Sequence, residues 1–285
     1  MLKLNLNKNL AAAALALLPA LTFGADTHRA QRVRWVMGTL CEIDAPGAPD
    51  SAISAAFAEI ERWDRILSLY KEDSEASALN RAAGRGPIKV SADLYAAVAS
   101  ALSFAEETQG AFDPTILPVL RGGPSKLPLV GWRKVRLDLS ARTIELPVAG
   151  MGLDFGGIGK GWALDKAAAV LKTSGAKRAR FNFGGQILTL GTWMVNVPGR
   201  AEPLTVTDAS VAASGDSEHP GHIKSPFDGL PVRRPGSAVA VMPNATAADA
   251  WSTALYVLGK NPPSFQGLSF FDSGIPAAPY KGGRS

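Results

Sequence analysis

Four glycines and a lysine stand within eight residues in the stretch DFGGIGKG, residues 154–161. The residues before it, IELPVAGMGL, are typical of a strand, and those after it, WALDKAAAVL, have the apolar spacing of a helix. Glycine costs backbone entropy wherever it stands, so this density indicates that something approaches the backbone closely. A strand, a glycine turn and a helix start present backbone N–H groups to an anion.

The glycine stretch does not match the common nucleotide-binding motifs. Its spacing to Lys160 differs from that of a Walker A loop, no Ser or Thr follows the lysine, and the pattern is not G-x-G-x-x-G. Tight packing of a strand against a helix explains the glycines equally well. A second glycine pair, Gly184-Gly185 in FNFGGQI, follows the helix.

The first residues have the pattern of an export signal. Lys3 and Lys8 precede an apolar run over residues 10–21, and the small residues Thr22 and Gly24 follow it. This pattern predicts that residues 1–24 are a Sec-type signal peptide, because the run is too short to span a membrane. No cysteine stands directly after the run, so a lipoprotein anchor is not expected. We expect an exported, periplasmic protein without a transmembrane segment.

The remaining composition excludes two classes of function. The net charge falls from +5 to +3 once Lys3 and Lys8 are removed, and the basic residues are scattered, so nucleic acid is not an expected partner. The single cysteine, Cys41, cannot form an internal disulfide and is expected to be a small core residue, so a thiol-based active site is not expected either.

The periodicity along the chain predicts one α+β unit over residues 25–280, with a loose tail at 281–285. Helices and strands do not alternate as a doubly wound sheet requires. Asp73-Ser74 is typical of a helix start, and residues 214–236, rich in Gly and Pro, predict an irregular loop. Helices are expected at 51–70, 94–108, 161–173 and 246–258, strands at 34–43, 178–183, 187–190 and 237–242, and a hairpin at 134–146.

A pair of oxygen-bearing side chains stands on the last of these helices. Asp249 and Thr253 are four residues apart and therefore share a face. A carboxylate and a hydroxyl are hard donors suited to Mg²⁺, which also takes phosphate oxygens. The alternative is that Asp249 complements the helix dipole and Thr253 is half-buried. A zinc site is not expected, because His219 and His222 in SGDSEHPGHIKSP lack further ligands.

The order of these segments resembles the ApbE-like FAD:protein FMN transferases, flavin-trafficking enzymes of the bacterial periplasm. The resemblance runs from residue 37 to 259 and rests on the segments MGTLCEI, ILSLYKEDSEASALN, GAFDPT, LDFGGIGKGWALDKAAAVLKTSGAKRARFNFGGQI, SGDSEHPGHIKSP and ATAADAWSTALYVLG.

The resemblance implies an α+β, T-fold-like architecture with FAD in a central cleft. It also implies that the FMN moiety of FAD is transferred, with Mg²⁺, to a threonine hydroxyl of an exported or membrane-attached redox protein, and that AMP is released. The matching metal positions are Asp249, Thr253 and the backbone carbonyl of Gly157. His222 and Lys160 match the catalytic positions, His222 as a base and Lys160 as a partner of phosphate charge. The matching flavin-nucleotide positions are Met37, Tyr70, Ala111, Phe112, Asp113, Asp154, Lys160 and Ile223.

The chain departs from the family pattern in three places, which puts rate and acceptor specificity in doubt, and two other functions stay open beside the transfer. Ser225-Pro226 stands where a DP pair is common, Gln186 follows the second glycine pair in place of Asp, and AASG has Ala213 in place of threonine. Mg²⁺-dependent hydrolysis of FAD to FMN and AMP is the first alternative. A non-catalytic flavin-binding or delivery protein is the second, although such a protein has no need for a metal pair.

Overall fold

The computed structural model describes residues 31–216 and 220–271. The predicted signal peptide and the predicted tail at 281–285 lie outside these residues, as does His219. Within them, no helix has the length and apolar character to cross a membrane.

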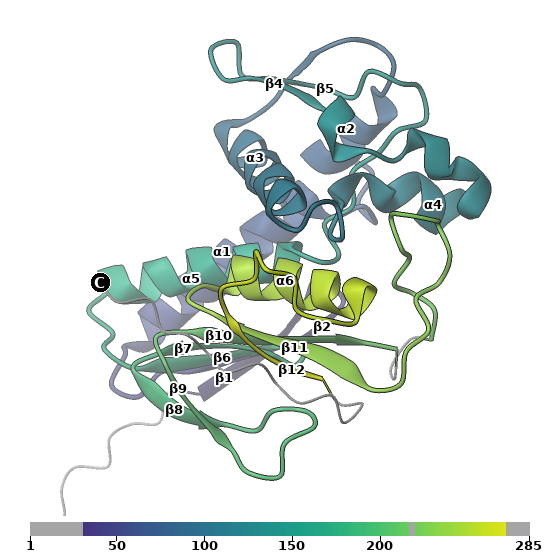
Figure 1. Ribbon diagram of the computed structural model, residues 1–285. Coiled ribbons are helices and arrows are strands. Elements are labelled where there is room, and N and C mark those ends of the chain that lie inside the picture. Colours follow the sequence, from purple (N-terminus) through teal and green to yellow (C-terminus); the bar gives the residue numbers. More distant parts are fainter. Residues whose placement is uncertain (1–30, 217–219, 272–285) are drawn as a thin grey trace, which may run out of the picture.

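A seven-stranded sheet, in the order β1-β2-β6-β7-β10-β11-β12, forms the base of the molecule (Figure 1). Every neighbouring pair in this sheet is antiparallel, so the sheet is not doubly wound. The strands are β1 (Gln31–Val36), β2 (Thr39–Asp44), β6 (Ala179–Phe183), β7 (Gln186–Leu190), β10 (Ser210–Gly215), β11 (Ser237–Met242) and β12 (Leu268–Phe271).

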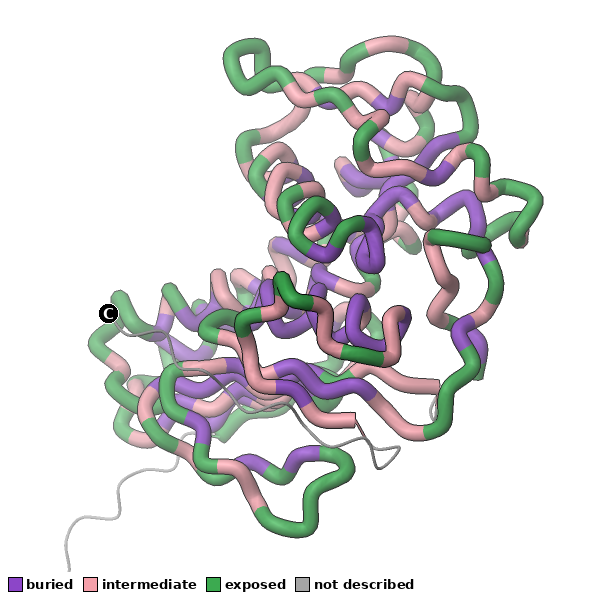
Figure 2. The backbone as a smooth tube through the Cα atoms, viewed as in Figure 1, coloured by how far each residue is buried: buried purple, intermediate pink, exposed green. Residues whose placement is uncertain are grey.

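Three helices cover one face of this sheet: α1 (Asp50–Leu67), α5 (Gly159–Thr173) and α6 (Ala245–Leu258). Apolar residues recur along α1 at helical spacing, among them Ile53, Phe57 and Ile60, and all three are buried. Helix α6 is apolar around most of its circumference, since it is packed between the sheet and its neighbours. Figure 2 shows the buried residues concentrated between these helices and the sheet.

The opposite face of the sheet is partly covered by a two-stranded ribbon of β8 (Thr192–Val195) and β9 (Leu204–Thr207). The ribbon joins the sheet through a small second core. Five buried valines form it: Val195, Val197, Val206, Val211 and Val239.

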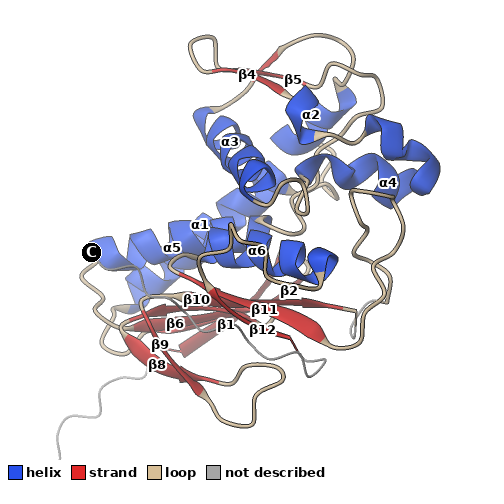
Figure 3. Cartoon of the chain, in the orientation of Figure 1, coloured by secondary structure: helices blue, strands red, loops and turns tan. Residues whose placement is uncertain are grey.

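A mainly helical part stands above the helix layer (Figure 3). Its side chains, including Leu79, Leu94 and Phe112, belong to the same hydrophobic core as the sheet and its helices. It contains α2 (Glu75–Arg81), α3 (Ala92–Glu107), α4 (Leu117–Gly122), the 3-10 turns η1 (Pro114–Ile116), η2 (Pro124–Leu129) and η3 (Trp132–Lys134), and a small sheet of β3 (Ile88–Lys89), β5 (Thr143–Glu145) and β4 (Arg136–Asp138).

The prediction of a single strand over residues 34–43 is wrong. The chain reverses at Met37 and Gly38, which have positive φ angles of 47° and 77°, and the two sides pair as the hairpin β1–β2. Two central residues with positive φ form the turn type that matches the twist of paired strands. Gly38 fits this turn, whereas a methionine seldom adopts the left-handed conformation, so the sequence signal was weak.

Most other predicted elements are confirmed within two residues, including the helix cap at Ser74, whose side chain accepts from Ser77 N–H. The helix predicted at 51–70 ends earlier, at Leu67. Cys41 is fully buried, and burial raises the pKa of its thiol to about 12, as expected of a core residue. The short strands β8, β9, β10 and β12 were not predicted.

Candidate active site

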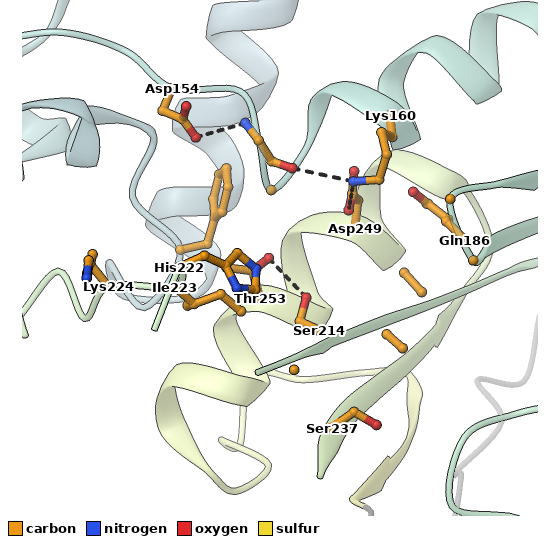
Figure 4. Close-up of a pocket in the computed structure, with 18 of the residues that line it drawn as sticks. Asp154, Lys160, Gln186, Ser214, His222, Ile223, Lys224, Ser237, Asp249 and Thr253 are labelled. Carbon is orange, nitrogen blue, oxygen red and sulfur yellow. Dashed lines mark hydrogen bonds and ion pairs between the residues drawn. The ribbon is translucent and has the colours of Figure 1, made fainter. Parts of the chain in front are cut away.

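A cavity of about 790 Å³ opens between the helical part and the ends of the central strands (Figure 4). Its wall is assembled from segments far apart in the sequence. They are the β1–β2 turn, residues 111–120, the glycine stretch, the β6–β7 turn, the end of β10, residues 222–226, the start of β11 and one face of α6.

The glycine stretch enters the cavity as a tethered loop and not as a continuation of a strand. The amide of Asn80 brackets Leu153, donating to its carbonyl at 2.9 Å and accepting from its N–H at 2.7 Å. Asp154 N–H donates to the carbonyl of Pro114 at 2.7 Å. These bonds fix where the chain turns into α5.

The glycines of this stretch have two different roles. A Cβ on Gly157 would lie 2.9 Å from Thr253 Oγ1 and 3.3 Å from the Phe112 ring, so this glycine keeps open the space beside predicted ligand positions. A Cβ on Gly161 would lie 2.2 Å from the backbone oxygen of Ala245, so this glycine lets α5 cross α6 closely. Gly159 is likewise buried against Phe155.

The expectation that the start of this helix presents backbone N–H groups to an anion is not met at Gly159 and Gly161. Both of their N–H groups are engaged within the protein. Gly159 N–H donates to the carbonyl of Phe155 at 2.7 Å, and Gly161 N–H donates to Asp249 Oδ2 at 3.0 Å.

Asp249 is buried, and its two oxygens face different groups. Oδ2 accepts the N–H of Gly161, so the carboxylate lies at the positive end of the α5 dipole and not at that of its own helix. Oδ1 lies 3.4 Å from Lys160 Nζ, which is also 3.4 Å from the carbonyl oxygen of Gly156. Both lysine contacts are long, and a buried carboxylate needs a nearby positive charge.

The donors around Asp249 fit Mg²⁺. Thr253 Oγ1 is on the same face of α6, 3.3 Å from Ser214 Oγ, and the missing side chain of Gly157 leaves room next to it. Over residues 31–216 and 220–271, no three His, Cys, Asp or Glu side chains gather as metal ligands. A metal here would therefore be held by one carboxylate, a hydroxyl and backbone oxygen, a hard-donor set that suits Mg²⁺.

The segment 111–113 builds the adjoining wall. Ala111 and Phe112 are buried apolar residues, and Asp113 is buried beside them. Burial raises the pKa of Asp113, while hydrogen bonds from Thr115 and from the N–H of Trp132 act in the opposite direction. Asp113 thereby caps η1 and holds this wall in place.

Asp154 is the second carboxylate on this side of the cavity. Its Oδ2 accepts the N–H of Gly156 at 2.8 Å. Burial raises the pKa of Asp154 above its ordinary value, and this hydrogen bond together with the charges of Lys160 and Arg121 offsets only part of the rise.

The loop after β10 brings His222 and Ile223 to the cavity wall. Residues 220–236 of this loop are irregular apart from an isolated bridge between Lys224 and Pro231. The side chain of His222 is exposed, and it interacts with another group of the protein.

The cavity therefore unites nearly all of the predicted site residues. Met37, Lys160, Asp249 and Thr253 all line it, together with the residues discussed above. Tyr70 is the exception: its exposed fraction is 100%, and it is not part of the wall. Its assignment to the flavin stays a prediction.

Several wall residues were not predicted as site residues. The hydroxyls of Ser214 and Ser252 share a hydrogen bond of 2.8 Å, and Ser214 Oγ lies 3.3 Å from Thr253 Oγ1. Gln186 is buried and Ser237 is half-buried on the sheet side. The signal that the sequence offered for these residues was their position, because polar residues at the ends of strands, beside Gly-rich segments, are frequent in functional sites.

Comparison with known proteins identifies relatives across most of the chain. The ApbE family model matches residues 37–264. A FAD:protein FMN transferase of Treponema pallidum is 30% identical, with 82% of this chain and 80% of that protein covered. A FAD:protein FMN transferase of Klebsiella pneumoniae is 28% identical, with 74% of this chain and 76% of that protein covered.

Solved structures share the architecture. The ApbE protein of Thermotoga maritima superposes with a TM-score of 0.72 at 24% identity, covering 80% of this chain and 86% of that chain. The flavin transferase ApbE of Vibrio cholerae superposes with a TM-score of 0.69 at 24% identity and the same coverage. These likenesses confirm the predicted α+β fold class, and the family model and the relatives show that this chain belongs to the ApbE family.

Proposed function

We propose that this enzyme transfers the FMN moiety of FAD to a threonine hydroxyl of an acceptor protein and releases AMP. One observation carries the proposal. A single cavity holds the carboxylate of Asp249, the hydroxyl of Thr253 and the ammonium of Lys160 next to the apolar wall of Ala111 and Phe112. The relatives named FAD:protein FMN transferase support the same activity.

The apolar wall and the charged residues would bind different parts of FAD. The Phe112 ring lies beside Gly157, so an isoalloxazine ring against this wall brings its phosphate chain toward Asp249 and Thr253. Lys160 offsets phosphate charge from the start of α5. Positioning and charge neutralisation are what phosphoryl transfer requires of a protein.

Asp249, Thr253 and the backbone carbonyl of Gly157 would hold Mg²⁺. Bound there, the ion would neutralise the diphosphate and make AMP a better leaving group. Lys160 then has to release Asp249 Oδ1 in part, which its long 3.4 Å contact makes easy.

The bond changes are a single displacement at phosphorus. The threonine oxygen forms a bond to the phosphorus of the FMN half while the bond from this phosphorus to the bridging oxygen breaks. The bridging oxygen leaves with AMP, and the hydroxyl proton passes to a base, which we assign to His222 on the cavity wall. FMN remains on the acceptor as a phosphoester.

We also propose that the reaction takes place in the periplasm on an exported or membrane-attached redox protein. The basic start, apolar run and small residues at positions 1–24 support export. Expression of the full chain followed by fractionation and N-terminal sequencing tests this, and an uncleaved protein in the cytoplasm would overturn it.

Incubation of the mature enzyme with FAD and Mg²⁺, with and without a threonine-bearing acceptor, tests the activity. Flavin fluorescence that stays with the denatured acceptor, together with one AMP per flavin, is the expected result. Replacement of the target threonine by alanine is the control. Free FMN and AMP in the presence of acceptor would indicate hydrolysis, and unchanged FAD would indicate binding alone.

A further inference from the structure

Two buried polar side-chain atoms in the cavity wall have no hydrogen-bond partner within the part of the chain that the structure describes. They are Gln186 Oε1 and Ser237 Oγ. Only 3% of Gln186 is exposed. Buried polar atoms in folded proteins are nearly always partnered by protein or water, so the acceptor of Gln186 needs a donor that the described residues do not supply.

The orientation of the Gln186 amide follows from its other hydrogen bond. Gln186 Nε2 donates to the backbone carbonyl of Ala245 at 2.8 Å. A carbonyl can only accept, so the nitrogen must face Ala245 and the oxygen must face away from it. Figure 4 shows this oxygen directed toward the side of the cavity where Lys160 and Asp249 lie.

The place of this oxygen narrows the choice of ligand group. Ala245 precedes Asp249 by one turn of α6, so the Gln186 amide lies within roughly 6 Å of the level of the predicted metal ligand. Groups bound here are therefore close to the diphosphate of FAD. The carbons nearest to a diphosphate belong to sugars, and their donors are hydroxyls.

The chemistry of the side chain fits a hydroxyl. An amide oxygen is a neutral acceptor, so it adds no negative charge beside Asp249 and a diphosphate. The neighbouring turn at Gly184-Gly185 has no side chains, and a Cβ on Gly185 would meet nothing within 4 Å, so a sugar can approach the wall closely.

We propose that Gln186 Oε1 accepts a hydrogen bond from a sugar hydroxyl of FAD next to its diphosphate, which makes Gln186 a substrate-binding residue. The assignment rests on the proposed function only in taking FAD as the substrate. The hydroxyl belongs either to the ribityl chain of the FMN half or to the ribose of the ADP half. Binding of the separate halves distinguishes these sources.

Gln186→Met keeps the length of the side chain and removes the acceptor. We expect calorimetric titration with Mg²⁺ present to show about 3- to 10-fold weaker binding of either FMN or ADP, and unchanged binding of the other. Thr189→Val is the matched control. Thr189 is on the same strand as Gln186 but does not line the cavity. The substitution removes the hydrogen bond from the Thr189 hydroxyl to the Ala209 carbonyl, and the affinities for FMN and ADP should both stay unchanged.

A ligand that lacks the hydroxyl separates contact from a purely structural role. In the parent, ADP or FMN without one sugar hydroxyl should bind about 3- to 10-fold more weakly than the complete ligand. In Gln186→Met, the deoxy ligand and the complete ligand should bind equally well. Gln186→Glu loses the donor to Ala245 and adds a negative charge, so it should bind every one of these ligands more weakly than the parent, but it keeps an acceptor and should still discriminate against the deoxy ligand. It also provides the answer if the Met variant does not fold.

Two results would overturn the assignment: unchanged affinities of Gln186→Met for both FMN and ADP, or an equal loss on removal of each sugar hydroxyl in the parent and in Gln186→Met. If these binding shifts are found but no flavin reaches an acceptor, the proposed transfer reaction fails and the binding role of Gln186 stands.

Discussion

Gly161→Ala tests whether the fourth glycine of the stretch serves helix packing. The new Cβ would lie 2.2 Å from the carbonyl oxygen of Ala245 and 2.9 Å from Asp249 Cβ. Because carbon and oxygen atoms come no closer than about 3.3 Å without strain, α5 and α6 have to separate by roughly 1 Å. The obstacle is backbone, so no side-chain rotation relieves it.

The expected cost follows from two opposing effects. Overpacking of a core costs about 1–3 kcal/mol, and a backbone obstacle places this site at the upper end. Alanine in place of glycine within a helix contributes about 1 kcal/mol in the favourable direction. The net loss is about 2 kcal/mol, which for a domain of this size lowers Tm by about 4–8 °C.

Thermal unfolding of the ligand-free protein, followed by circular dichroism, measures this loss. Gly156→Ala is the control: Gly156 is exposed, and its Cβ would meet only the movable Asp154 carboxylate, so Tm should change by less than about 2 °C. A Gly161→Ala protein with an equal or higher Tm than the parent would refute the packing role of Gly161.

Three further substitutions test the site itself. Asp249→Asn keeps an oxygen for the N–H of Gly161 but removes the charge, so Mg²⁺-dependent turnover should fall by roughly 100-fold or more; near-normal turnover by the folded variant excludes the metal role. Gly157→Val should weaken Mg²⁺-dependent FAD binding by roughly 10- to 100-fold, measured by quenching of flavin fluorescence, because its side chain fills the space beside Thr253; unchanged quenching contradicts this. His222→Asn should slow single-turnover transfer by roughly 10²–10⁴-fold and leave FAD affinity within a few-fold, and a parent-like rate would place the base elsewhere.

Local sequence patterns were enough to predict most helices and the nature of the site. Helix α6 shows why. Its cap at Asn244, its apolar spacing and Gly259 at its end are all signals within one segment, and the same spacing puts Asp249 and Thr253 on one face. Strands of four residues such as β8 and β9 leave too short an alternation to recognise.

The different roles of identical residues were decided only by the tertiary structure. In the sequence, Gly157 and Gly161 are equivalent members of one glycine-rich stretch. Their roles separate because α6, more than 80 residues later in the chain, places Thr253 beside the first and the backbone of Ala245 against the second.

The same contact explains Gln186. The sequence marks it only as the residue after a glycine pair, and nothing local indicates whether its amide is buried or which way it faces. The carbonyl of Ala245, brought to it by the packing of α6 on the sheet, fixes that orientation. Periodicity and caps are properties of neighbouring residues and are written into the sequence, whereas the direction of a buried polar atom depends on partners that only the folded chain brings together.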